Sequence, residues 1–108
     1  MYSRSEDRFR EINTHALPIG ILPSFQSDPP TRVQLRPGDL ILLSTDGLFE
    51  WENAQGQEFG IDQVQSVIRS CRDLVPNEII AKLYQAVVRF SSGSKQQDDL
   101  TTVIIKRV

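Results

Sequence analysis

The clearest apolar periodicity lies between residues 61 and 90, where apolar side chains recur at three- and four-residue steps. The first set has this spacing at Ile61, Val64, Val67, Ile68, Cys71 and Leu74. The second set continues it at Ile79, Ile80, Leu83, Val87 and Phe90. Each set predicts an amphipathic helix, the first over 61–73. The second helix is expected to begin at Pro76, because the N–H that proline lacks would be unpaired at that position.

Shorter apolar segments have the composition of strands. Residues 40–45 are almost continuously apolar, which is typical of a strand covered on both faces. Residues 100–105 form a β-branched run that predicts the last strand. Apolar side chains alternate over 31–35, and a proline-glycine pair at the centre of 36–39 predicts a type II turn, so 31–35 and 40–45 are expected to form a hairpin. A weak alternation over 8–13 permits one more strand.

The remaining segments are predicted to be irregular. Residues 14–30 are rich in proline and indicate a long connection, and 91–97 form a polar loop. A short helical turn is expected over 48–53. The order strand, strand, helix, helix, strand, with a possible extra N-terminal strand, predicts an α+β fold in which two helices cover one face of a mostly antiparallel sheet. His15 lies in the irregular connection without a catalytic pattern around it, so we expect a structural role.

Composition excludes several classes of function. The chain has 108 residues, of which 39% are apolar and 24% charged, as in one ordinary globular domain. Twelve basic and fourteen acidic residues, without a basic block, argue against nucleic acid as a partner. No apolar run approaches the roughly 20 residues of a membrane span, and the polar N-terminus is unlike a secretory signal, so a cytoplasmic location is expected. Cys71 is the only cysteine, which excludes an internal disulfide and predicts a buried side chain.

Two aspartate positions are candidates for chemistry because each lies where a predicted strand meets a loop. Asp46 follows residues 40–45, and Asp98-Asp99 precedes residues 100–105. If these strands are antiparallel neighbours, Asp46 and Asp98 converge at one edge of the sheet, where their oxygens suit Mg²⁺ or Mn²⁺. The alternative is structural, because Asp-Gly after a strand is first of all a turn signal and an Asp-Asp pair can be a solvated loop.

The arrangement of several motifs resembles one protein family. Residues 36–50, RPGDLILLSTDGLFE, resemble the hallmark segment of sporulation-E/RsbU phosphatases, in which a PGD turn leads into an apolar strand and TDGLxE. Downstream, Glu58-Phe59-Gly60 resembles the eFG that opens the next helix, and residues 97–101, QDDLT, resemble xDDxT. Upstream, residues 17–21, LPIGI, look like the family's xPLGI. The resemblance covers nearly the whole chain.

The resemblance implies a phosphatase-type β-sandwich flanked by helices, with Mn²⁺ or Mg²⁺ in a binuclear site. The metal-binding aspartates of TDG and DDxT carry over to Asp46 and Asp98. In such a site the ions activate a water molecule for in-line attack on phosphoserine or phosphothreonine, without a covalent phosphoenzyme. The implied substrate is a phosphorylated regulatory protein of the anti-anti-sigma type.

Other residues of the matched motifs are expected to support the ligands rather than to react. Gly47 would keep a side chain away from the tight strand exit. Glu50 and Asp99 are candidates for supporting or capping contacts, and Thr101 is expected to orient the loop. Trp51, beside the motif, is expected to pack under the short helix rather than to form a substrate platform.

The family's N-terminal half has no counterpart in this sequence. That half carries a glycine-rich segment with an acidic ligand and a further aspartate, and nothing before Asp28 resembles either; Glu6 and Asp7 are interpreted as surface charge. Residues 1–108 are therefore expected to be a single partial domain, the C-terminal half of the phosphatase domain. The alternative function is a non-catalytic interaction module, and exposed sheet edges could pair with a second copy. A weaker alternative is a small α+β binding domain whose aspartates are only turns.

Overall fold

The computed structural model describes residues 1–13, 18–24, 29–96 and 98–108. His15, the other residues of 14–17 and 25–28 in the predicted connection, and Gln97 lie outside the described residues. The elements follow one another as strands β1 and β2, strand β3, the 3₁₀ turn η1, helices α1 and α2, and strand β4. Their bounds are Tyr2–Ser3, Arg8–Phe9, Leu40–Ser44, Asp46–Leu48, Gly60–Cys71, Pro76–Ser91 and Thr102–Lys106.

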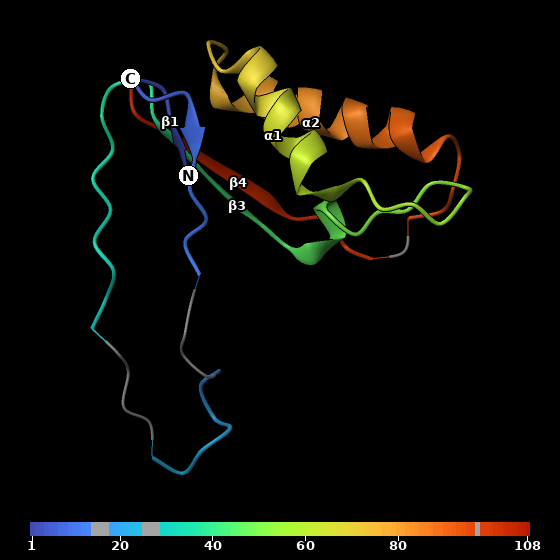
Figure 1. Ribbon diagram of the computed structural model, residues 1–108. Helices are drawn as coiled ribbons and strands as arrows, with labels where there is room; N and C mark the ends of the chain where they lie inside the picture. Colours follow the sequence, from blue (N-terminus) through green and yellow to red (C-terminus); the bar gives the residue numbers. More distant parts are fainter. Residues whose placement is uncertain (14–17, 25–28, 97) are drawn as a thin grey trace.

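The four strands form one antiparallel sheet in the order β2-β1-β3-β4. Strand β3 pairs with β4 along its whole length, from Leu40 opposite Lys106 to Ser44 opposite Thr102. Strand β1 meets the other edge of β3 at Tyr2 alone, opposite Leu40. Both helices lie on the same side of this sheet (Figure 1). The predicted α+β fold, a mostly antiparallel sheet with two helices on one face, is confirmed.

The predicted hairpin is only partly correct. Its turn is present, because Asp39 N–H donates to Arg36 O over 2.9 Å and Gly38 has a φ of 88°, which suits glycine. Residues 31–35, however, do not form a strand. The place beside the turn is taken by β1, since Tyr2 lies opposite Leu40, and β4 occupies the other edge of β3. The extra N-terminal strand appears as Arg8–Phe9 and pairs with β1.

Both helices were predicted from periodicity, and both are confirmed. Helix α2 begins at Pro76, after the extended residue Val75, as the proline suggested. The buried apolar positions of both helices belong to the predicted stripes, although Ile61 of the first stripe is 51% exposed. They form one core with side chains from β1, β3, η1 and the segment after η1. This core consists of Tyr2, Leu40, Leu48, Trp51, Phe59, Val64, Ile68, Cys71, Ile79, Leu83 and Val87. Burial of Cys71 is thus confirmed, and desolvation raises the pKa of its thiol.

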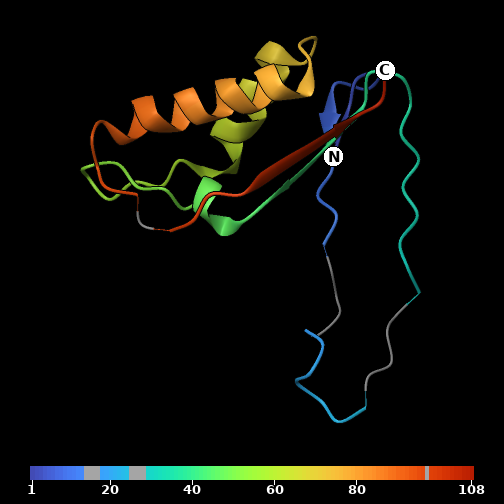
Figure 2. The same ribbon diagram turned by 180° about the vertical axis from the view of Figure 1, so that it is seen from behind.

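One face of the sheet is not covered by the helices. The cross-strand pairs Ile41–Ile105 and Leu43–Val103 share this face. Leu43 is 55% exposed, and Val103 and Ile105 are each 48% exposed. The prediction that β3 is covered on both faces is therefore wrong for the residues that the structure describes, because α1 and α2 cover one side only. Seen from behind, β3 and β4 run side by side, with both helices to their left and residues 29–36 to their right (Figure 2).

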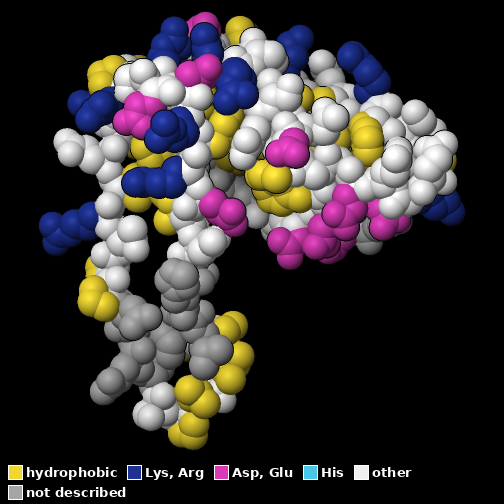
Figure 3. All heavy atoms as spheres, viewed as in Figure 1, with side chains coloured by type: hydrophobic (Ala, Val, Ile, Leu, Met, Phe, Trp, Pro, Cys, Tyr) yellow, Lys and Arg dark blue, Asp and Glu magenta, His cyan; other side chains and the backbone are white. Residues whose placement is uncertain are grey.

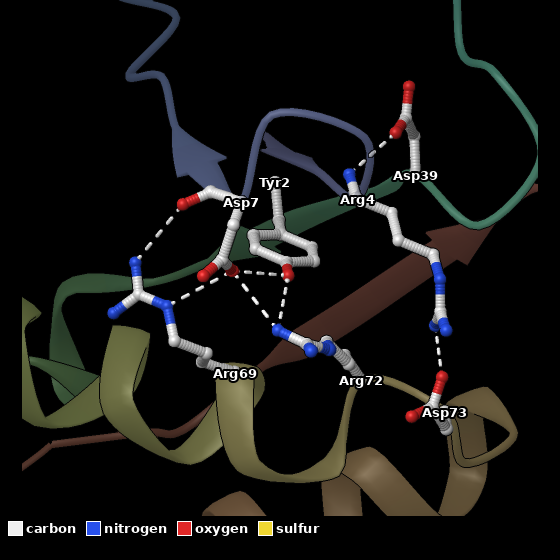
Figure 4. A network of polar contacts seen from close by, with 7 residues as sticks. All are labelled: Tyr2, Arg4, Asp7, Asp39, Arg69, Arg72 and Asp73. Atoms are coloured by element: carbon white, nitrogen blue, oxygen red, sulfur yellow. Dashed lines mark hydrogen bonds and ion pairs between the residues drawn. The ribbon is translucent and has the colours of Figure 1, made fainter.

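A buried carboxylate holds the turn before β3 against the N-terminal hairpin. The Asp39 side chain is 2% exposed and accepts backbone N–H groups from Arg4, over 2.8 Å, and from Arg36, over 2.9 Å. The Arg4 guanidinium also pairs with Asp73, just beyond α1 (Figure 4). These contacts join three parts of the chain that are distant in sequence. None of the described helices is long and apolar enough to cross a membrane.

A second polar cluster joins β1 and β2 to helix α1. The buried Tyr2 donates its hydroxyl hydrogen to Asp7 Oδ1 over 2.6 Å, and Arg69 and Arg72 reach the same oxygen over 3.2 and 3.1 Å (Figure 4). The Arg69 guanidinium also lies 5.2 Å from the ring centre of Phe9. Asp7 is half-exposed, as a surface charge would be, but it connects the hairpin to the helix.

The Asp7 cluster predicts a specific loss of stability in acid. The hydrogen bond from Tyr2, aided by Arg69 and Arg72, lowers the pKa of Asp7 below its ordinary value of 3.8. Because the pKa of Asp7 is lower in the native state than in the unfolded state, Asp7 stabilises the native state at pH values above its unfolded-state pKa. This stabilisation is lost as the pH falls through its native-state pKa. Asp7→Asn should therefore lower the free energy of unfolding at neutral pH and weaken its fall below about pH 4, measured by urea denaturation at several pH values. The exposed neighbour Glu6→Gln should keep the wild-type profile; equal acid sensitivity of Asp7→Asn and wild type would contradict this account.

Candidate functional site

The β3–β4 ladder brings the two aspartate segments to the same end of the sheet. Strand β3 runs toward Asp46, and β4 begins shortly after Asp98 and Asp99. Because the strands are antiparallel, the end of one lies beside the start of the other. The pairing extends beyond the ladder, since Thr45 N–H donates to Thr101 O over 3.0 Å. This is the arrangement on which the metal-site interpretation depends.

The hydroxyl group of Thr45 fastens the two segments together. Its Oγ1 donates to Asp99 O over 3.1 Å and accepts the backbone N–H of Thr101, also over 3.1 Å. Thr101 thus takes part in the loop contact through its backbone. No pattern in the sequence singles out Thr45, although it stands directly before Asp46, because its partners follow only from the pairing of distant strands.

Gly47 is the closest point of contact between the two segments. A Cβ added there would lie 2.4 Å from Asp99 O, a distance that real Cβ atoms essentially never show, and 3.2 Å from Asp99 C. The backbone of Gly47 is not in the left-handed region. The glycine is therefore required by space and not by conformation, and it lets the Asp98-Asp99 backbone lie directly over the exit from β3.

The two candidate ligands are exposed and have defined local surroundings. Asp46 is the first residue of η1, two residues earlier than the helical turn predicted over 48–53, and its carbonyl accepts N–H groups from Phe49 and Glu50, each over 2.9 Å. Asp98 Oδ1 accepts the N–H of Asp99 over 2.7 Å. Acidic side chains gather on the surface at this end of the sheet, where η1 lies (Figure 3). The local potential therefore favours a cation.

A small cavity of about 50 Å³ opens at this rim and is lined by Gly47, Glu50, Trp51 and Asp98. Trp51 is 7% exposed and belongs to the core, as its predicted packing role requires. Within the part of the chain that the structure describes, its buried Nε1 has no hydrogen-bond partner. Such an unpaired group is uncommon, since leaving a buried donor unsatisfied costs about 1–3 kcal/mol.

Three further candidates, Asp46, Asp99 and Thr101, are not among the residues that line this cavity. Among the described residues, no group of three or more His, Cys, Asp or Glu side chains is arranged to hold a metal ion. The oxygen ligands nevertheless suit Mg²⁺, which keeps several waters and commonly binds through one or two carboxylates together with a substrate phosphate. The residues thus fit an open site and not an enclosed cage.

Comparison with known proteins identifies the family of the chain. The family described as stage II sporulation protein E (SpoIIE) matches the chain over residues 1–108. The chain belongs to this family. Among curated proteins, stage II sporulation protein E of Bacillus subtilis (strain 168) is 29% identical over 101 residues, which are 93% of this chain. The chain spans only 12% of the length of that relative. No solved structure matches the chain.

The contact at Gly47 predicts that even a methyl group disturbs the site. Gly47→Ala should lower the free energy of unfolding by about 1–3 kcal/mol, the usual cost of overpacking, because the Asp99 backbone must move. It should also weaken Mn²⁺ binding, since Asp98 moves with that loop. Denaturation and calorimetry measure the two effects.

Gly56→Ala is the matched control for this substitution. A Cβ at Gly56 has nothing within 4 Å, but its φ of 74° strains any other residue. The control should therefore lose stability without losing affinity for Mn²⁺. If Gly47→Ala had the same free energy of unfolding and the same affinity for Mn²⁺ as the wild type, the close contact at Gly47 would not determine the structure of the site.

Proposed function

We propose that this chain is the C-terminal half of a metal-dependent serine/threonine protein phosphatase domain, and that it contributes Asp46 and Asp98 as metal ligands. The observation that carries the proposal is the antiparallel register of β3 and β4, which puts the segments of both aspartates at one rim beside a cavity. Membership of the SpoIIE family gives the proposal its reaction class.

In the proposed site each residue has a distinct task. Asp46 and Asp98 offer hard oxygen ligands to Mn²⁺ or Mg²⁺. A bound divalent cation would neutralise phosphate charge and lower the pKa of water for attack on phosphorus. Gly47 lets the two ligand segments approach each other, and the Thr45 hydroxyl holds them there. Glu50 and Asp99 add negative charge around the ligands.

The proposed substrate is a phosphoserine or phosphothreonine in a regulatory protein of the anti-anti-sigma type. This part of the proposal rests on the resemblance of residues 36–50 and 97–101 to the sporulation-E/RsbU motifs. An exposed, acidic rim at the end of a sheet is accessible to a protein-borne phosphate once a cation is bound, because the cation offsets the repulsion between carboxylates and phosphate.

A second candidate function is a non-catalytic interaction module. It is favoured by the open sheet face, where Leu43, Val103 and Ile105 are about half-exposed. It is also favoured by the small number of ligands, since two carboxylates alone hold an ion weakly. In this alternative the fold is retained for contact with another segment or another copy, and hydrolysis is absent.

A Mn²⁺ titration distinguishes these functions. Calorimetry should detect Mn²⁺ binding to the wild type, and Asp46→Asn and Asp98→Asn should each weaken it by at least about tenfold, because each removes a proposed direct ligand. Asp62→Asn, an exposed aspartate in the first turn of α1, should bind as the wild type does. Hydrolysis of p-nitrophenyl phosphate is measured in parallel.

The outcomes separate activity from metal binding. Turnover that is lost in both aspartate variants supports the enzyme, and binding without turnover supports a metal-binding half that another segment completes. Absence of Mn²⁺ binding to the wild type would contradict the proposed metal site and leave the interaction module as the better account.

A further inference from the structure

One edge of strand β3 is largely without a partner in the part of the chain that the structure describes. Strand β4 pairs with β3 over its whole length, whereas β1 meets the opposite edge only where Tyr2 lies opposite Leu40. No described strand continues beside residues 41–44 on that side. These residues therefore form an edge at which another strand can pair.

The register of the β3–β4 ladder shows which backbone groups face this edge. Thr45 N–H donates to Thr101 O over 3.0 Å, in continuation of the register. In an antiparallel pair the bonded residues alternate along each strand, so the odd-numbered residues of β3 bond to β4. The N–H and C=O groups of Leu42 and Ser44 therefore point to the free edge.

The free edge lacks the features by which sheets commonly prevent edge pairing. Such features are charged side chains, proline and bulges. Strand β3 is Leu-Ile-Leu-Leu-Ser and pairs with β4 without a bulge. Beside the edge lies the uncovered face of the sheet, on which Leu43 is 55% exposed. The edge thus offers unpaired backbone groups next to an apolar surface.

The two ends of β3 differ in charge. Exposed acidic residues surround its end, namely Asp46, Glu50, Asp98 and Asp99. Exposed basic residues surround its start, namely Arg8, Arg10, Arg36 and Arg107. At that end Asp7 is already paired with Arg69 and Arg72, and the basic residues outnumber Glu6 and Glu11.

This distribution of charge makes the edge complementary to itself. If a second copy of the chain pairs antiparallel to β3, the acidic end of each copy lies beside the basic end of the other. A parallel arrangement would put like charges together. Complementary charge therefore favours one orientation and selects a second copy as the partner.

We propose that a second copy of this chain pairs with the free edge of β3, so that two copies form one continuous antiparallel sheet around a two-fold axis at Leu43. Leu42 of each copy lies opposite Ser44 of the other, and each of these pairs exchanges two backbone hydrogen bonds. At the axis the two Leu43 side chains meet on the open face, where cross-strand neighbours are close. The pairing goes beyond the proposed function, because it needs no metal ion.

Amide hydrogen exchange on the wild type tests the pairing directly. Two residue pairs make a small interface, so a weak dimer is expected, and NMR spectra in EDTA are compared at about 50 µM and about 1 mM protein. The amides of Leu42 and Ser44 should exchange several-fold more slowly in the concentrated sample. Those of Ile41 and Leu43, which bond to β4, should be equally slow in both. Sedimentation velocity should show the dimer over the same range.

Two substitutions at the edge should weaken the dimer, and each acts twice because of the two-fold axis. Ser44→Pro removes an N–H that faces the second copy and leaves the backbone bonds to β4 intact, as edge strands allow. It should raise the dissociation constant about tenfold or more. Leu43→Lys puts two like charges opposite each other and should raise it about fivefold or more.

Val103→Lys is the matched control. Val103 lies on the same open face and is 48% exposed, but it belongs to β4 and not to the edge. This variant should therefore keep the dissociation constant of the wild type.

Two results would overturn the pairing. The first is a wild type that stays monomeric at about 1 mM with fast exchange at Leu42 and Ser44, which would leave the edge to a strand from another protein. The second is a dimer that Val103→Lys and Leu43→Lys weaken equally, without protection of Leu42 and Ser44, because the copies would then stack through the open face. Exchange is measured on the wild type, so the conclusion does not depend on how well Ser44→Pro folds.

Discussion

The antiparallel ladder between β3 and β4 is the interaction on which the rest of the structure depends. These strands are the longest in the sheet and are separated by both helices in the sequence. Helices α1 and α2 pack on one of their faces, and the N-terminal hairpin meets the free edge of β3. A single register of this ladder thus fixes the core and also brings Asp46 and Asp98 to one rim. A slip by one residue would exchange the two faces of the sheet.

Two tethers with different chemistry hold the ends of β3. At its start the buried Asp39 carboxylate accepts hydrogen bonds from two backbone N–H groups, and these charge-assisted bonds take the place of water around the carboxylate. At its end the Thr45 hydroxyl and the bare backbone of Gly47 let a loop from β4 close over the strand. The same closeness leaves several carboxylates at one edge of the sheet, which is where we propose that a divalent cation binds.

Local periodicity was enough to predict both helices, because the stripes from Val64 to Val87 report directly which side of each helix is buried. The rim could be predicted only by assuming that the two apolar strands are neighbours, which is a statement about topology. Three features could not be predicted from the sequence. Residues 31–35, which the structure describes, form no strand, and Tyr2 of β1 rather than Leu35 lies opposite Leu40. The link from Tyr2 to α1 and the unpaired N–H of Trp51 depend on distances between remote segments, which no sequence spacing encodes.

The central claim is that the TDG and DD segments form one cation site. Paramagnetic broadening by substoichiometric Mn²⁺ in a ¹H–¹⁵N spectrum of the wild type tests it most directly, because broadening falls steeply with distance from the ion. The account predicts that the amide resonances of 46–51 and 98–101 are lost first and together. Loss at only one of these segments, or first loss elsewhere on the acidic surface, would contradict it.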